Sequence, residues 1–89
     1  MITSPQQQAV DAAITSHPDW VIKASRQQAE SIMDEGKAQY YDAAARWLGK
    51  ARAAYQATGR QQEWQRYLTG LLARHQRKYK LVPLLKALR

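Results

Sequence analysis

Two long amphipathic patterns, separated by one short turn, occupy residues 40–79, which read YYDAAARWLGKARAAYQATGRQQEWQRYLTGLLARHQRKY. Apolar and aromatic residues recur every three or four positions on both sides of the turn, as on one face of an α-helix. The first set is Tyr41, Ala44, Leu48, Ala51 and Tyr55, and the second is Trp64, Tyr67, Leu68, Leu71, Leu72, His75 and Tyr79. They predict helices over 38–58 and 60–79, each roughly 30 Å long. Because Gly59 alone separates them, we expect an antiparallel helical hairpin.

Shorter helical patterns lie on either side of this hairpin. A helix is predicted over 4–16, where Ser4 suits the N-cap position. Another is predicted over 18–35, and Gly36 follows it as a residue that can take a positive φ at a helix C-terminus. Leucines at helical spacing near the end of the chain predict a short capping helix over 82–88.

These patterns predict one all-α domain over residues 1–89, built from antiparallel helical hairpins. We expect a solenoid-like, tetratricopeptide-like right-handed array of about five helices, although these helices are longer than a repeat of about 34 residues permits. Gly49, inside the third predicted helix, either admits the close approach of a neighbouring helix or is merely tolerated. The predicted core consists of Trp20, Tyr41, Trp47, Leu48, Tyr55, Trp64, Leu68, Leu71, Leu72, His75 and Tyr79.

The charge of the chain is concentrated in its last third. The formal net charge is +7, and residues 60–89 contain eight Lys and Arg residues against one acid, Glu63, whereas residues 1–59 are neutral. A basic region of this kind favours polyanions or acidic protein surfaces as partners. No apolar run approaches the ~20 residues that span a bilayer, and the N-terminal sequence lacks the pattern of a secretion signal. We therefore expect a cytoplasmic protein without a transmembrane segment.

Residues that carry catalysis or bind metals are scarce. Without cysteine, the chain has no disulfide and no thiolate chemistry. His17 and His75 lie far apart in sequence, whereas a zinc site needs three or four clustered ligands. Asp34 and Glu35 form the one carboxylate cluster, and solvated turn residues explain it. We therefore expect no catalytic, cofactor-binding or metal-binding residue in this chain and no enzymatic activity.

The best candidate for binding is a set of five cations: Arg66, Arg74, Arg77, Lys78 and Lys80. Side chains of this kind can contact a phosphate backbone or an acidic partner. Alternatively, they stabilise the carbonyl end of a helix, by about 0.3–1 kcal/mol each, and keep its outer face soluble. Tyr79 fits the buried stripe of its helix, so the sequence identifies no exposed aromatic side chain that could stack on bases.

A resemblance to a known family is carried by residues 38–85, which read AQYYDAAARWLGKARAAYQATGRQQEWQRYLTGLLARHQRKYKLVPLL. This stretch resembles the helical region near the C-terminus of bacterial SWIM-type zinc-finger proteins, where the pattern WL..AR..Y...GR..EW..YL..L...H.RKYKL.PLL follows the finger. Residues 17–37, HPDWVIKASRQQAESIMDEGK, are similar to the preceding helix of those proteins. The family's finger holds zinc through cysteines and a histidine. Because this chain has no cysteine, no zinc ligand is carried over to any of its residues.

The resemblance implies a helical module that accompanies nucleic-acid-binding or protein-binding fingers. The function we expect is therefore a non-enzymatic protein-interaction module, belonging to or derived from a SWIM-type zinc-finger protein. The alternative is sequence-independent nucleic-acid binding through the basic C-terminal third. Association with anionic membrane surfaces is disfavoured, because the apolar faces are committed to the core.

Overall fold

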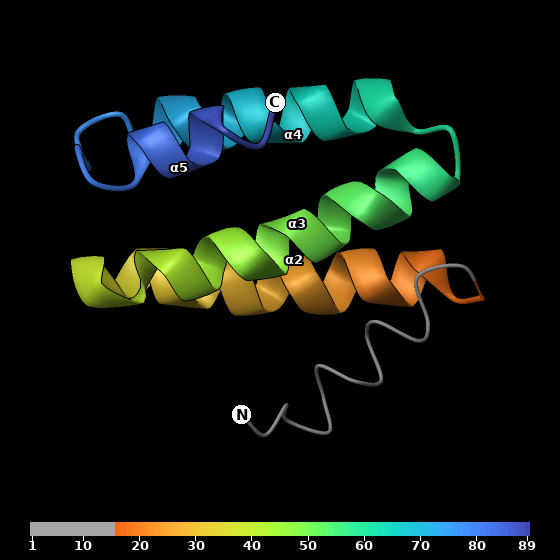
Figure 1. The fold of residues 1–89 in the computed structure, drawn as a ribbon, viewed down its shortest axis with the longest axis horizontal. Coiled ribbons are helices and arrows are strands. Elements are labelled where there is room, and N and C mark those ends of the chain that lie inside the picture. Colours follow the sequence, from red (N-terminus) through yellow and green to blue (C-terminus); the bar gives the residue numbers. More distant parts are fainter. Residues whose placement is uncertain (1–15) are drawn as a thin grey trace.

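The computed structural model describes residues 16–89, and in this part of the chain every regular element is helical (Figure 1). The elements in order are α2 (Pro18–Glu35), the 3₁₀ turn η1 (Ala38–Tyr40), α3 (Tyr41–Ala57), α4 (Gln61–Arg74) and α5 (Val82–Lys86). The prediction of an all-α fold is confirmed for these residues. The helix predicted over 4–16 lies outside them, except for Ser16, which is in a turn.

The helices α2 and α3 form a packed antiparallel pair (Figure 1). α2 starts at Pro18, whose missing N–H costs nothing in the first turn of a helix. It ends at Gly36, where a φ of 72° is tolerated because glycine has no Cβ. The Gly36 N–H donates to the carbonyl oxygen of Met33 at 3.1 Å, and η1 then reverses the chain. Small side chains let the two helix axes approach closely, and the fully buried alanines are Ala29, Ala44, Ala51 and Ala54.

A tight turn after α3 sends α4 back along it. The Thr58 hydroxyl donates to the carbonyl oxygens of Ala54 and Tyr55 at 3.0 and 3.1 Å, which satisfies two carbonyls at the end of α3. Gly59 then adopts a φ of 69°, and the Arg60 N–H donates to the carbonyl oxygen of Tyr55 at 2.8 Å. The turn therefore has the form that the sequence led us to expect from a single glycine.

Trp64 packs between α3, α4 and the end of the chain after α5. Its side chain is 1% exposed, and its ring centroid lies 5.9 Å from that of Tyr55 on α3 and 6.1 Å from that of Tyr67 on α4. The Trp64 indole N–H also donates to the main-chain carbonyl oxygen of Leu88 at 3.3 Å, just beyond α5. Around it, the buried residues of the last two helices and their connection are Leu68, Leu71, His75, Leu81 and Leu85.

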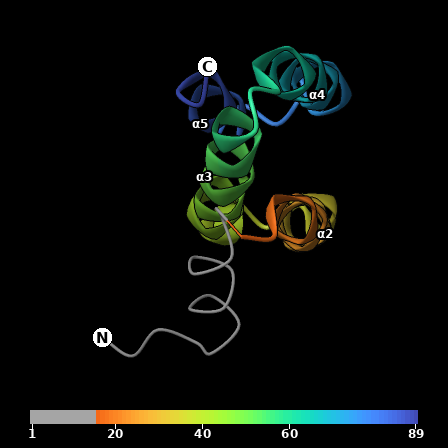
Figure 2. The same cartoon turned by 90° about the vertical axis from the view of Figure 1, so that its right-hand side faces the viewer.

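The helices α2 and α4 run parallel to each other on the same side of α3 (Figures 1 and 2). Long polar side chains bridge α2 to α4 and to Arg60, the residue before α4. Three of the pairs are separated by 40 or 41 residues in sequence: Asp19 with Arg60, Arg26 with Tyr67, and Asp34 with Arg74. Arg74 also lies 3.9 Å from Glu30, which is 44 residues earlier. The fold is therefore two successive helical hairpins, α2–α3 and α4–α5, whose first helices are in parallel register.

The fourth helix is shorter than the predicted 60–79, and this corrects the predicted position of Tyr79. α4 ends at Arg74, and the chain turns through residues 75–81 before α5 begins. Tyr79 is consequently 85% exposed instead of belonging to the core. The physical reason is the burial of Leu81 and Leu85, which pack into the core from α5 and the residue before it. A helix continuing to residue 79 would carry both leucines away from that core.

Trp20 is the second predicted core residue that lies on the surface. It is 46% exposed, because the first turn of α2 directs Val21 and Ile22 inward in its place. Leu72 is only partly buried. The other predicted core residues are buried: Tyr41, Trp47, Leu48, Tyr55, Trp64, Leu68, Leu71 and His75. The last helix, α5, spans 82–86, shorter than the predicted 82–88, since the chain passes into a turn at Ala87.

Gly49 does not serve the close approach of another helix. A Cβ atom built at this position of α3 would meet no heavy atom within 4 Å, and the same holds for Gly70 in α4. Of the two explanations left open by the sequence, the structure therefore supports a tolerated glycine at a partly exposed helical position.

Candidate binding interface

The five cations predicted as a binding face do not form one continuous surface. Arg74 faces α2, where its guanidinium nitrogens lie 3.4 Å from an Asp34 carboxylate oxygen and 3.9 Å from a Glu30 carboxylate oxygen. The Lys78 ammonium donates to the main-chain carbonyl oxygen of Met33 at 2.6 Å. Both cations therefore hold the end of α4 and the following turn against the C-terminal end of α2. Lys78 contacts the carbonyl end of a helix, but that helix is α2 and not its own.

Arg77, Tyr79 and Lys80 project from the connection between α4 and α5, which we call the basic loop (residues 75–81). The loop is held at both ends, because His75 is 3% exposed and Leu81 is fully buried. The Lys78 N–H donates to the carbonyl oxygen of His75 at 2.9 Å, and the Leu81 N–H donates to that of Lys78 at 2.9 Å. The loop therefore presents an exposed aromatic ring between two exposed cations on an ordered backbone.

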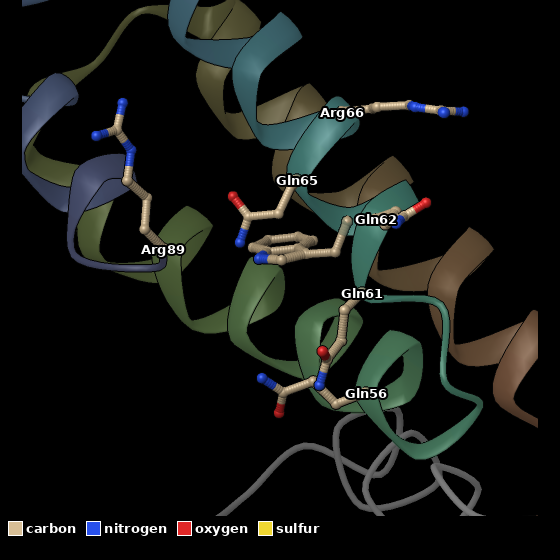
Figure 3. Close-up of a pocket in the computed structure, with 7 residues that line it drawn as sticks. Gln56, Gln61, Gln62, Gln65, Arg66 and Arg89 are labelled. Atoms are coloured by element: carbon tan, nitrogen blue, oxygen red, sulfur yellow. The ribbon is translucent and has the colours of Figure 1, made fainter.

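Arg66 lies in a different place, at the edge of a pocket of about 720 Å³ at the other end of α4, and its side chain extends away from those of Gln65 and Arg89 (Figure 3). Among residues 16–89, Arg66 and Arg89 supply the two cations of the pocket, and no carboxylate side chain lines it. We call it the glutamine pocket, because its lining residues are Gln56, Gln61, Gln62, Trp64, Gln65, Arg66 and Arg89. Most of the lining residues belong to the run QQEWQR at 61–66, which is visible in the sequence. The sequence does not show that Gln56 and Arg89 lie beside this run.

Glu63 belongs to the same turn of α4 as the lining residues of the glutamine pocket, but it does not line the pocket. Arg60 donates to its two carboxylate oxygens at 2.6 and 3.3 Å, and to an Asp19 oxygen on α2 at 2.7 Å. Hydrogen bonding from Arg60 lowers the pKa of Glu63 below its ordinary value. Because Arg60 compensates this charge locally, the polar side chains that line the pocket from residues 16–89 are guanidinium and carboxamide groups, beside the indole of Trp64.

A second, smaller pocket of about 310 Å³ lies along α2 and is lined by Asp19, Ile22, Lys23, Arg26, Gln27, Glu30 and Arg60. The Arg26 guanidinium lies 4.0 Å from the centroid of the Tyr67 ring, a cation–π geometry. Burial, with a contribution from the Glu30 charge, raises the pKa of Tyr67 to about 12, so the phenol stays protonated. Arg26 and Arg60 were missed by the sequence analysis, because their contacts depend on how α2 and α4 pair.

The two histidines occupy unlike environments. His17 is exposed at the start of α2, whereas His75 is buried with its Nε2 atom unpaired. Burial and, to a smaller extent, the nearby Lys78 and Arg74 charges lower the pKa of His75 below its ordinary value, so it is neutral at pH 7. Within residues 16–89, no group of three or more His, Cys, Asp or Glu side chains is placed to hold a metal ion.

Comparisons with known proteins return no relative for this chain. A scan against protein-family models, a search of curated proteins and a search of solved structures each find no match. What the geometry defines is the class, an all-α protein over residues 16–89. In the part of the chain that the structure describes, no helix is long and apolar enough to cross a membrane.

Proposed function

We propose that this chain is a non-enzymatic helical module that binds a protein partner, belonging to or derived from a SWIM-type zinc-finger protein and acting in the cytoplasm. Its helices form a solenoid-like, right-handed array. Two observations support this arrangement: the hairpins follow one another, and α2 and α4 are in parallel register. Helical arrays of this kind commonly bind partner segments along their grooves.

The glutamine pocket carries the proposal, because its chemistry defines a partner. Carboxamide side chains both donate and accept hydrogen bonds, so Gln56, Gln61 and Gln62 can pair with the amide groups of an extended peptide. The guanidinium groups of Arg66 and Arg89, which lie on opposite sides of the pocket (Figure 3), donate only, and each can bind a carboxylate in a bidentate manner. The partner is therefore an extended, acidic polypeptide segment.

A labelled acidic peptide tests this function directly. The probe is a fluorescein-labelled peptide of alternating glutamate and glycine, titrated with the full chain and followed by anisotropy. Arg66→Gln should weaken binding roughly tenfold, because it removes a charged hydrogen bond. Arg77→Gln is the matched control, since it removes the same charge from the basic loop, outside the pocket.

Two results would contradict the pocket as the binding site. Equal weakening by Arg66→Gln and Arg77→Gln would show that the peptide responds only to the net charge. If the unmodified chain does not bind the peptide at low salt, the proposal of an acidic partner is wrong. Gln62→Ala adds an uncharged substitution at the pocket, which should also weaken binding without altering the net charge.

The second candidate function is sequence-independent nucleic-acid binding through the basic C-terminal third. The observation that favours it is that Arg77 and Lys80 are exposed, and the structure gives neither an ion pair within residues 16–89. Lys86 and Arg66 add further exposed charge to the same third of the chain. Binding to duplex and single-stranded oligonucleotides should weaken steeply with salt. Failure to bind either oligonucleotide at about 50 mM salt would exclude this function.

A further inference from the structure

Tyr79 is the most exposed large aromatic side chain among residues 16–89. Its 85% exposure compares with 46% for Trp20 and 46% for Tyr40. Within the described residues its ring makes no aromatic or cation–π contact. An aromatic ring that is open to solvent on this scale can lie flat against another planar group.

The backbone that carries Tyr79 is fixed, although its side chain is not covered. On one side Lys78 is tied to α2 through the carbonyl oxygen of Met33. On the other side Leu81 is fully buried, and the N–H groups of Leu81 and Val82 both donate to the carbonyl oxygen of Lys78, at 2.9 and 3.1 Å. A ring on a pre-ordered backbone loses less conformational entropy when it binds than one on a flexible segment.

The charges beside Tyr79 have one sign. Arg77 and Lys80 are exposed on either side of it in sequence, and no acid follows Glu63 in the chain. Asp34, which comes from the end of α2, lies 3.4 Å from Arg74 and is compensated by it. The field around the ring therefore attracts anions and repels cationic partners.

An aromatic ring flanked by exposed cations matches the chemistry of a nucleotide in a single strand. Bases stack on aromatic side chains, and phosphates on either side meet the cations. In a duplex the faces of the bases are covered by their neighbours in the stack, so an aromatic side chain reaches them only at the ends.

We propose that the basic loop binds single-stranded nucleic acid, with Tyr79 stacking on one unpaired base and Arg77 and Lys80 contacting the phosphates beside it. This inference rests on the second candidate function, and it gives that function a substrate class and a central residue. The glutamine pocket plays no part in it.

The test uses the full chain and a fluorescein-labelled oligothymidylate of twelve nucleotides, with a hairpin duplex of the same length as comparison. Tyr79→Ala should weaken single-strand binding about tenfold, as the loss of one base–aromatic stack predicts. Tyr79→Phe keeps the ring and should bind as the unmodified chain does. Tyr40→Ala removes a half-exposed tyrosine from η1, outside the basic loop, and should have no effect. Arg77→Gln and Lys80→Gln each remove one phosphate contact, so each should reduce the slope of log K against log salt concentration by about 1.

Each result shows whether nucleic-acid binding, the stacking of Tyr79 on a base, or both are wrong. If the chain binds neither oligonucleotide, both the second candidate function and this inference are wrong. If it binds and Tyr79→Ala has no effect, nucleic-acid binding stands and the stack is overturned. The stack is also overturned if Tyr79→Phe binds as weakly as Tyr79→Ala, or if Tyr79→Ala weakens duplex binding equally. A loss of acidic-peptide binding in Tyr79→Ala, with oligothymidylate binding unchanged, would assign the ring to a protein partner and overturn the inference.

Discussion

The side-chain ammonium of Lys78 lies 2.6 Å from the main-chain carbonyl oxygen of Met33, which is 45 residues earlier in the chain. The last carbonyl groups of a helix have no partner within the helix, and a cation placed near them is favourable. Here the cation comes from the turn after α4, so one hydrogen bond joins the end of the first described helix to the basic loop. Fold stability and the position of Tyr79 are therefore linked through Lys78.

Lys78→Met should destabilise the protein by about 1 kcal/mol, since it removes one hydrogen bond to a charged group that is partly exposed. The methionine keeps most of the apolar stem, so packing is preserved. The measurement is urea unfolding followed by circular dichroism. Lys80→Met is the matched control, because Lys80 is exposed and should change the free energy of unfolding by less than about 0.5 kcal/mol. Equal effects of the two substitutions would contradict a specific role for Lys78.

Trp64→Phe should cost about 1–3 kcal/mol, because it leaves the carbonyl oxygen of Leu88 without its indole donor and opens a small cavity. Trp64→Ala should cost about 3–5 kcal/mol, as other large-to-small core changes do. Trp20→Phe is the control, since Trp20 is 46% exposed and its replacement should change stability by about 0.5 kcal/mol or less. The measurement is the midpoint of urea unfolding for the three variants. A loss of stability in Trp20→Phe as large as that in Trp64→Phe would contradict the assigned core.

The positions of α2 and α3 could be predicted from the sequence, whereas the end of α4 and the turn that follows it could not. Periodicity places α2 and α3, because each has one apolar face that repeats over four or five turns. The same periodicity extends through His75 to Tyr79 and so predicts too long a fourth helix. The residues of that stretch do not show that the helix must end at Arg74. It ends there because Leu81 and Leu85 are buried in the core, which they reach from the other side of the turn.

The binding surfaces depend on that same turn, which explains why they were only partly predicted. The exposed position of Tyr79 follows from the end of α4 at Arg74. The glutamine pocket forms only because the chain returns through α5, which brings Arg89 to the side chains of α4 and to Gln56 at the end of α3. Local pattern identifies residues suited to binding, whereas tertiary packing decides which of them share a site.

Gly70→Ala should stabilise the protein by about 0.5–1 kcal/mol, because an exposed helical glycine is replaced by the best helix former. A Cβ at Gly70 would meet open space, so no steric cost offsets the gain. Gly59→Ala should have the opposite sign, since φ is 69° at this position and a side chain there is strained. Thermal unfolding of the two variants compares these effects, and a destabilising Gly70→Ala would contradict the open environment found for that residue.

Acidification should destabilise the protein through His75. The folded-state pKa of this buried imidazole lies below its ordinary value of 6.5, with burial as the largest cause, Lys78 and Arg74 acting in the same direction, and Asp34 opposing them. The unfolded chain therefore binds a proton first as the pH falls through about 6.5, and the folded state loses stability by up to about 1.4 kcal/mol per pH unit until His75 itself is protonated. Above that pH both states are neutral at this position, and the full stability is present.

Urea unfolding of the intact protein and His75→Leu between pH 7.5 and 5.5 tests this dependence. The variant should lose most of the slope, whereas His17→Gln, at an exposed position, should keep it. A stability of the intact protein that does not change over this range would contradict the assignment. Lys78→Met provides a second check, because it removes a cation that lowers the pKa of His75. That variant should be less stable at pH 7.5 and yet lose less stability on acidification, since its imidazole accepts a proton in the folded state at a higher pH than the intact protein's does.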